Sequence, residues 1–224
     1  EGVDLQIVLE KLNTSCAICS EPPYAAVWLS PRNAEVDSRN IEELQKIQAT
    51  SRMYRGSITG NFKHDRLPSP MELILKPGAQ VMFSKNDQDR RWINGSIGRV
   101  VKLGDDCIVV EMVKTGKLVD VGRVKWPDYQ YAWNAYTNEI ERREIGNYTQ
   151  FPLILGWAIT IHKSQGRTIE KVHLDLGSGA FETGQTYVAL SRCRSLDGLT
   201  LSRALTATDI LVDEESKVFY QDLR

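Results

Sequence analysis

The sequence predicts an α/β protein built on a parallel sheet, with a small antiparallel β-barrel inserted into it. Two observations predict this fold class. Between residues 151 and 202 the chain alternates helix-like and strand-like stretches, which is typical of a parallel sheet. Residues 79–124 instead hold several short β-rich runs separated by turn signals such as Thr115-Gly116, which is typical of antiparallel hairpins.

The composition limits the class of protein. A length of 224 residues allows one large domain or two small ones. A hydrophobic content of 42% with 25% charged residues is typical of a globular protein, and no apolar run is long enough to cross a membrane. The net charge of -1 argues against a uniformly basic nucleic-acid-binding protein. Nucleic-acid binding would therefore depend on a local patch.

The cysteines predict free thiols in a reducing cytoplasm. There are only four of them in the chain, which is too few for a disulfide framework at this length. Cys16 and Cys19 form a C-x-x-C pair, but a zinc site needs two more ligands and the three histidines lack the spacing to supply them. We therefore expect no metal site.

The first 50 residues predict a helix, a strand and a second helix. Apolar residues recur at helical spacing from residue 5 to residue 12, and the apolar run at 25–29 is typical of a strand. Ser30-Pro31 is a cap and first-position pair that predicts the start of the second helix. The turn between strand and helix places Arg32 at the edge of the sheet where ligands bind.

The middle of the chain changes in character. Residues 51–75 have no clear period and contain scattered Gly and Pro, so we expect a loop-rich connection with one strand at 55–58. The barrel strands are expected at 79–83, 98–103, 107–113 and 117–124. A dense aromatic cluster follows, made of Trp126, Tyr129, Tyr131, Trp133 and Tyr136. Such a cluster can stack bases or form the seam between two domains, and we favour the seam.

The stretch from residue 152 to residue 202 holds the densest chemistry. Pro152 to Lys163 starts with Pro at a first helical position and is apolar around most of its surface, which predicts a buried helix. Polar residues crowd its expected end, up to Gly166. A strand is predicted at 172–176, a helix capped by Thr183 next, and a last strand at 198–202.

Two motifs in this stretch resemble those of one family. AITIHKSQGRTI (158–169) resembles motif V, and TYVALSRCRSLDGL (186–199) resembles motif VI, of the Pif/RecD-type superfamily-one DNA helicases. The resemblance implies a RecA-like sheet of the P-loop NTPase type. It implies that Arg192 reaches the γ-phosphate of ATP held on the other RecA-like domain. It also implies nucleotide contacts by Gln165 and Gly166, and single-stranded DNA contacts by Thr160, His162, Lys163 and Ser164.

Two further stretches resemble the same family. Leu29, Pro31 and Asn40 resemble its motif IV, in which some members carry an arginine that touches the nucleotide, here Arg32; a solvated turn arginine is the alternative. KPGAQVMFSKND and WINGSIGRV resemble its inserted Src-homology-three-like barrel. That likeness implies a second RecA-like domain at 1–75 plus 141–224 and the barrel with its aromatic connection at 76–140. The candidate DNA contacts of the barrel are Lys85, Asn86, Arg90, Arg91 and Trp92, and the alternative is a barrel that only braces the domain.

The sequence contains no phosphate loop of the form G-x-x-x-x-G-K-[ST]. We therefore expect the chain, which begins EGVDLQ, to be the C-terminal half of a helicase, inactive alone. The expected partners are single-stranded DNA and the N-terminal RecA-like domain, which would bind most of ATP and Mg²⁺. The resemblance implies 5′-to-3′ movement and work in DNA repair or recombination. The alternatives are a non-catalytic nucleic-acid-binding module and a protein-docking module that reuse this domain.

Overall fold

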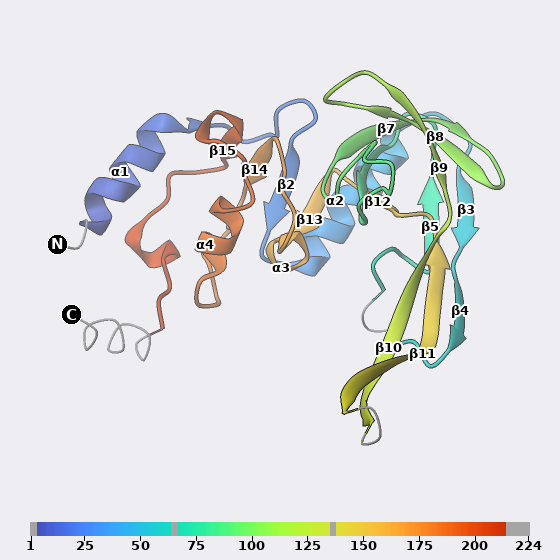
Figure 1. Ribbon diagram of the computed structural model, residues 1–224. Coiled ribbons are helices and arrows are strands. Elements are labelled where there is room, and N and C mark those ends of the chain that lie inside the picture. The colour runs from blue at the N-terminus through green and yellow to red at the C-terminus, as the bar shows by residue number, and fades with distance from the viewer. Residues whose placement is uncertain (1–3, 64–66, 135–137, 214–224) are drawn as a thin grey trace. The chain divides into compact units, whose positions relative to one another are not determined.

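The computed structural model describes residues 4–63, 67–134 and 138–213 (Figure 1). By packing, these residues form two compact units. The first unit comprises the described parts of Glu1–Lys46, Asn94–Ile97 and Gly156–Arg224. The second unit comprises those of Ile47–Ile93 and Gly98–Leu155. The domains predicted at 1–75 plus 141–224 and at 76–140 are defined by the family resemblance and not by packing, so they stay a prediction.

The first unit is an α/β layer structure. Its sheet has the order β1-β15-β14-β2-β13, and every neighbouring pair is parallel, which confirms the predicted class. Its strands are β1 (Ala17–Ile18), β2 (Val27–Ser30), β13 (Ala158–Thr160), β14 (Val172–Leu174) and β15 (Leu199–Leu201). Its helices are α1 (Leu5–Ser15), α2 (Asn33–Lys46), α3 (Ile161–Ser164), α4 (Gln185–Leu190) and the 3-10 turns η2 (Leu196–Gly198) and η3 (Ala207–Asp209).

Helix α2 packs on β2 and β13. Trp28, Val36 and Ala158 form a buried cluster at this contact. The Asn40 amide donates to the Ala158 carbonyl over 2.9 Å and accepts from the Ala158 N–H over 3.0 Å. Since buried main-chain groups need partners, Asn40 completes the hydrogen bonding of β13 at the end of the sheet order.

The buried helix predicted from Pro152 to Lys163 is wrong. The structure has β12 (Leu153–Leu155), then β13, and helix only at Ile161–Ser164. All three residues of β13 are buried, and a short apolar run buried on both sides shows the same pattern in a strand as in a helix. Gly156 and the β-branched Ile159 and Thr160 were the signals for strands.

Two helix starts also differ from prediction. Helix α2 starts at Asn33 and not at Pro31, because Ser30 is still in β2 and its hydroxyl accepts the Arg32 N–H over 3.2 Å. Helix α4 is capped by Gly184, with φ of +73°, and not by Thr183. Both errors are shifts of one or two residues, which local sequence patterns leave open.

The second unit consists of strands. They are β3 (Arg52–Arg55), β4 (Ser57–Gly60), β5 (Glu72–Leu75), β6 (Gln80–Phe83), β7 (Ile97–Leu103), β8 (Cys107–Met112), β9 (Leu118–Gly122), β10 (Val124–Asn134), β11 (Glu139–Gln150) and β12. The four predicted barrel runs become β6 to β9 in a sheet of order β12-β6-β7-β8-β9, in which β7–β8 and β8–β9 are antiparallel hairpins. Closure of this sheet into a barrel stays a prediction.

The loop-rich connection expected at 51–75 is wrong in part, because it holds three strands. β3 pairs with β5 antiparallel across the intervening residues, and β4 pairs with β11. Their partners lie far along the chain, so the local pattern was weak. Tyr54 of β3 packs edge-on against Phe151, with ring centroids 4.9 Å apart.

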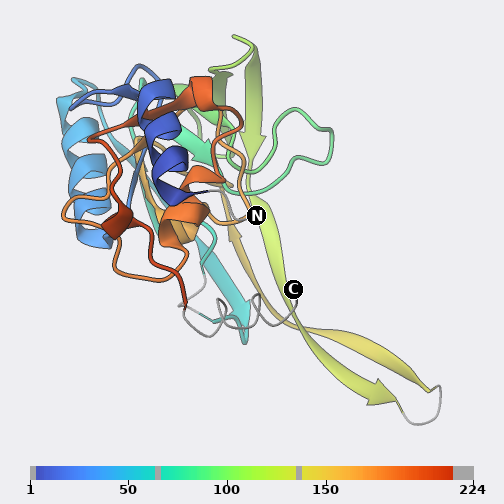
Figure 2. The same ribbon diagram turned by 90° about the vertical axis from the view of Figure 1, so that its left-hand side faces the viewer.

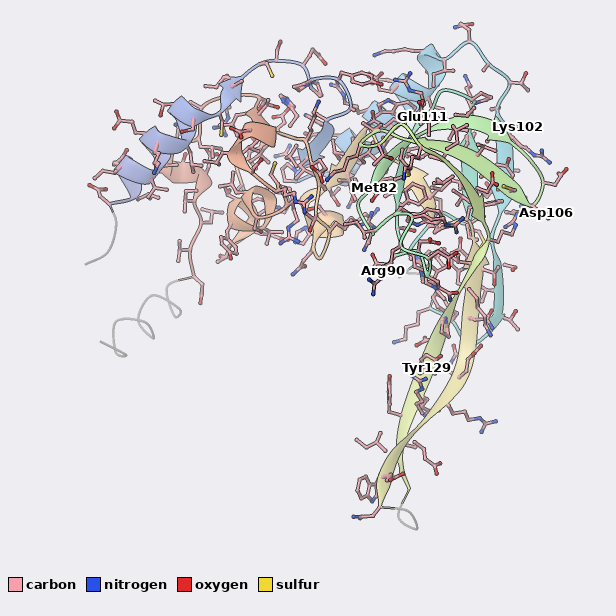
Figure 3. All side chains as sticks on the ribbon, turned by 45° about the horizontal axis from the view of Figure 1, so that its top comes forward. Met82, Arg90, Lys102, Asp106, Glu111 and Tyr129 are labelled. Atoms are coloured by element: carbon pink, nitrogen blue, oxygen red, sulfur yellow. The ribbon has the colours of Figure 1, made fainter. Side chains whose placement is uncertain are left out.

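The aromatic cluster lies mostly on the hairpin of β10 and β11, a long twisted ribbon (Figure 2). Trp126 stacks on Tyr148 inside the second unit, with centroids 5.7 Å apart. Tyr131 and Trp133 are 65% and 60% exposed, so the prediction that they are buried in a domain seam is wrong. Tyr129 lies on the same strand (Figure 3), and Tyr136 is outside the described residues.

Among the described residues, no helix is long and apolar enough to span a membrane.

A buried histidine in the sheet predicts loss of stability in mild acid. His173 on β14 is fully buried, and its Nδ1 lies 3.0 Å from the Thr200 hydroxyl. Burial lowers the pKa of His173; Arg39 acts in the same direction, and Asp175 and Glu21 oppose it. In the unfolded chain the His173 imidazole therefore takes up a proton at a higher pH than in the folded chain. The free energy of unfolding falls as pH falls below about 6.5.

We expect this pH dependence to be weaker in His173→Gln, which cannot titrate. Urea unfolding of both proteins at pH 7.5 and at pH 5.5 measures it. The loss of unfolding free energy between the two pH values should be larger for the wild type. An equal loss in both proteins would contradict the assignment to His173.

Candidate functional site

Four neighbouring strands of the first unit deliver polar side chains to one edge of the sheet. Because β13, β2, β14 and β15 are parallel, their carboxyl ends meet there. Ser30 ends β2 and Thr160 ends β13, while Asp175 and Ser202 directly follow β14 and β15. Ligands bind at this edge in open α/β sheets.

Two predicted site residues form the inside of the turn after β13. Thr160 is 3% exposed, and as the N-cap of α3 its hydroxyl accepts the Lys163 N–H over 3.4 Å. Ser164 is fully buried, and its hydroxyl donates to the Ile161 carbonyl over 2.6 Å. These side chains hold the turn together, which speaks against direct DNA contacts by them.

The other predicted residues of this turn are exposed. His162, Lys163, Gln165 and Gly166 all face solvent. The His162 Nε2 lies 2.6 Å from a carboxylate oxygen of Glu182, a partner that the sequence did not reveal. Gly166 has φ of +76° and open space where a side chain would be. A ligand can therefore approach the main chain at Gly166.

Arg192, the predicted finger arginine, follows the end of α4 and is half-buried. Its Nε donates to the Val188 carbonyl over 3.1 Å, its Nη1 to the Arg167 carbonyl over 3.3 Å, and its Nη2 to the Ser191 hydroxyl over 2.9 Å. A guanidinium has five N–H donors, so two remain beyond these three bonds. The arginine is thus oriented and still able to bind an anion.

The main chain around Arg192 is joined to the loop after α3. The Ile169 N–H donates to the Arg192 carbonyl over 3.0 Å, and the Arg194 N–H donates to the Ile169 carbonyl over 3.2 Å. Ile169 and Cys193 form an isolated parallel bridge. Burial lowers the pKa of Arg167, whose carbonyl is the one that Arg192 contacts. The structure therefore brings the two predicted motifs into direct contact.

Arg32 connects the turns after two strands. Its Nη2 donates to the Ser178 hydroxyl over 3.1 Å, and its Nη1 lies 3.9 Å from Glu35. The Ser30 hydroxyl donates to the same Glu35 carboxylate over 2.5 Å. With its side chain 53% exposed, Arg32 suits both readings, the nucleotide contact and the solvated turn arginine.

Sequence reasoning missed an ion pair beside this edge. Asp209 is 1% exposed and accepts from Arg203 over 2.6 and 2.7 Å. The Arg203 hydrogen bond holds the pKa of Asp209 at about 2, and bonds from Thr206 contribute. The Arg203 Nε also donates to the Gly177 carbonyl over 3.2 Å. The spacing of Thr206 and Asp209, which form a capping box, was the available signal.

Four of the five candidate DNA contacts in the second unit, all except Arg90, line a cavity of about 430 Å³. Trp92 lies in its wall but is only 5% exposed; its ring stacks on Phe83 at 4.5 Å, and its indole N–H donates to the Lys85 carbonyl. This burial speaks against base stacking by Trp92. The Lys85 ammonium donates to the Lys125 carbonyl over 2.7 Å and lies 5.3 Å from the Trp126 ring centroid, and burial lowers its pKa.

The other basic residues there differ in availability. Arg91 makes two hydrogen bonds of 2.8 Å to the Asp87 carboxylate, which hold the pKa of Asp87 at about 2. Asn86 lines the cavity and is exposed. Arg90 is exposed in the loop after β6 (Figure 3). Among the residues placed by the structure, no group of three or more His, Cys, Asp and Glu side chains is arranged to hold a metal ion.

An open parallel sheet with an exposed polar turn at its carboxyl edge defines a ligand-binding class of α/β domain. No family model matches the chain. The Pif1 helicase of Bdellovibrio bacteriovorus is 36% identical over 198 residues, which are 86% of this chain and 42% of that protein. Crystal structures of Bacteroides Pif1 match with 34% identity: the ADP-AlF4 complex has a TM-score of 0.85 over 98% of this chain and 50% of that one.

The single-stranded DNA complex of Bacteroides Pif1 has a TM-score of 0.66 over 97% of this chain and 50% of that one. The chain is therefore a member of the Pif1 helicase family, matched over most of its own length. It spans less than half the length of the curated relatives that it matches and about half of the crystallised chains.

We expect Asp209→Asn to destabilise the first unit. The substitution removes the carboxylate charge to which Arg203 donates two hydrogen bonds. The free energy of unfolding should therefore fall by roughly 2–3 kcal/mol. Urea denaturation at pH 7 measures it. Asp197→Asn is the matched control, because Asp197 is exposed in η2, and it should change stability by less than about 0.5 kcal/mol. Equal effects of the two substitutions would refute the structural role of the pair.

Proposed function

We propose that this chain is the second RecA-like domain, with its inserted β-barrel, from the C-terminal half of an ATP-dependent DNA helicase. The observation that carries the proposal is the position of Arg192. It is bonded to the loop after α3, with two N–H groups left for an anion. A binding or docking module would not need this arrangement.

In this proposal Arg192 acts as an arginine finger. Bound ATP would supply the reacting phosphate and Mg²⁺ would neutralise part of its charge, both held mainly by the N-terminal RecA-like domain, the proposed partner. The Arg192 guanidinium stabilises negative charge that develops as the terminal phosphoryl group is transferred. Its bonds to the Val188 and Arg167 carbonyls fix the direction of the charge before ATP arrives. A charged group that is already held in position stabilises the transition state without first having to reorganise.

Further nucleotide contacts are proposed at the carboxyl edge of the sheet. Gln165 offers an exposed amide, and Gly166 leaves room for a phosphate at its main chain. Arg32 adds a cation at the end of β2, and its bond to Ser178 keeps it beside the turn after β14. These three residues lie around the proposed nucleotide site at this edge and leave the site itself open.

Burial removes some of the predicted residues from the set of proposed DNA contacts. Lys163 and His162 are exposed on the turn after β13 and can reach phosphates, whereas Thr160 and Ser164 set the shape of that turn. In the second unit Asn86, Arg90 and Arg91 are exposed beside Lys85, and Arg91 is already paired with Asp87. The single-stranded DNA complex of Bacteroides Pif1, named above, supports this substrate. The proposed polarity, 5′ to 3′, follows from the family resemblance.

The first test is ATP hydrolysis by the longer protein that contains this chain. Arg192→Ala should lower kcat on the order of a thousandfold while leaving the fold intact. Arg194→Ala is the matched control, because Arg194 is exposed two residues away and pairs with Glu170 over 2.9 Å. It should keep kcat close to the wild-type value. Full activity in Arg192→Ala would refute the finger. Absence of turnover in a folded, DNA-binding wild type would leave the non-catalytic binding module.

A second test concerns DNA. Lys163→Ala should weaken single-stranded DNA binding and reduce the slope of log affinity against log salt by about one. Lys171→Ala is the control, because Lys171 is also exposed but precedes β14, at the opposite edge of the sheet. Fluorescence anisotropy over a salt series measures both. Equal slopes for the two variants would show that the turn does not contact the DNA backbone.

A further inference from the structure

A short turn that follows β6 in the sequence belongs to the first unit. Residues Asn94–Ile97 belong to this unit by packing, although Ile93 and Gly98 on either side belong to the second. Gly95 is buried, with φ of +93°. A Cβ on Gly95 would lie 2.9 Å from the Thr168 carbonyl oxygen, 3.3 Å from the Thr168 nitrogen and 3.2 Å from the Arg167 Cβ. Two of these atoms are main chain, so the loop itself would have to move.

The loop touched by Gly95 is the one that holds Arg192. The Arg167 carbonyl accepts the Arg192 Nη1 over 3.3 Å. The Ile169 N–H donates to the Arg192 carbonyl over 3.0 Å. Residues 167–169 therefore contact Gly95 through Arg167 and Thr168, and they contact Arg192 through its side chain and its main chain.

We propose that Gly95 is a positioning residue for Arg192, acting through the loop at 167–169. The absence of a side chain lets the turn approach the loop closely, and the position of the loop sets the Arg167 carbonyl that orients the guanidinium. Any side chain at position 95 pushes this carbonyl away. The proposal deepens the proposed function, because it gives Gly95 a catalytic consequence only if Arg192 acts on ATP.

Gly78 provides a matched control. Its φ is +92°, and a Cβ there would meet only the flexible end of Ile47, at 3.8 and 3.9 Å. Gly78→Ala therefore carries the backbone strain of a positive φ without the close main-chain contact. A difference between Gly95→Ala and Gly78→Ala reports the contact and not the strain.

The first measurement needs no activity. In this chain labelled with ¹⁵N-arginine, NMR follows the Nε–H resonance of Arg192, assigned by its loss in Arg192→Lys. Gly95→Ala should shift or broaden this resonance, and Gly78→Ala should leave it unchanged. An unchanged resonance in folded Gly95→Ala would overturn the proposal, whatever the outcome of the activity tests.

The second measurement is steady-state ATP hydrolysis by the longer protein. Gly95→Ala should lower kcat by about tenfold to a hundredfold with KM for ATP unchanged. A small displacement of a catalytic group from its productive position is enough for such a loss. In an Arg192→Ala background, Gly95→Ala should lower the residual rate no further. Independent, multiplicative losses, or an unchanged kcat, would overturn the proposal. If wild type itself does not hydrolyse ATP, the proposed function fails and the NMR result alone decides the contact.

If Gly95→Ala does not fold, insertion of one glycine between Gly95 and Ser96 takes its place. The insertion loosens the turn without adding a Cβ. The Arg192 resonance and kcat should change in the same direction as for Gly95→Ala. A folded insertion variant with wild-type values for both would overturn the proposal.

Discussion

The fixed position of Arg192 depends on the main-chain pairing between the loop at 167–169 and residues 192–194. Two hydrogen bonds and one parallel bridge join segments that lie more than twenty residues apart in sequence. A long arginine side chain has many rotamers, and fixing it costs conformational entropy. Because the pairing places the Arg192 backbone beside the Arg167 carbonyl, this cost is met during folding. The charge therefore has one position before any ligand arrives.

The charges of this chain mostly neutralise one another. Arg203 with Asp209 and Arg91 with Asp87 are short pairs whose carboxylates have strongly lowered pKa values. The basic stretch that the sequence shows around residues 85–102 is therefore less positive than its composition indicates. Binding of a polyanion then depends on a few exposed cations at the sheet edge and in the loop after β6, and on their geometry.

The sequence predicted the parallel sheet, α1, the barrel strands and the polar segment at 162–166 well, because each has a strong local pattern. It failed where burial on all sides removed the pattern, as at 158–160, which was read as helix. The burial of Trp92 and Ser164 could not be predicted either. Each depends on packing that folding creates: the Phe83 ring stacked on Trp92, and the turn after β13 around Ser164.

Long-range partners explain the remaining gaps. Glu182 beside His162, Asn40 against Ala158 and Gly95 against Thr168 are all contacts between separate segments. A family motif marks such residues without saying what they touch. Motif IV drew attention to Asn40, for example, and the structure gives its physical task, which is to satisfy the main chain of β13.

The ribbon of β10 and β11 has a consequence for local unfolding. Among the described residues, β4 pairs with β11 only at 146–149, so further out each strand has the other as its partner in the ladder. Two-stranded ribbons are marginally stable in water. The outer ribbon can therefore open while the rest stays folded, and its amide hydrogens should exchange with solvent long before those of the parallel sheet. Tyr131 and Trp133 then lie on a segment that can open by itself, and a binding partner there would also stabilise its folding.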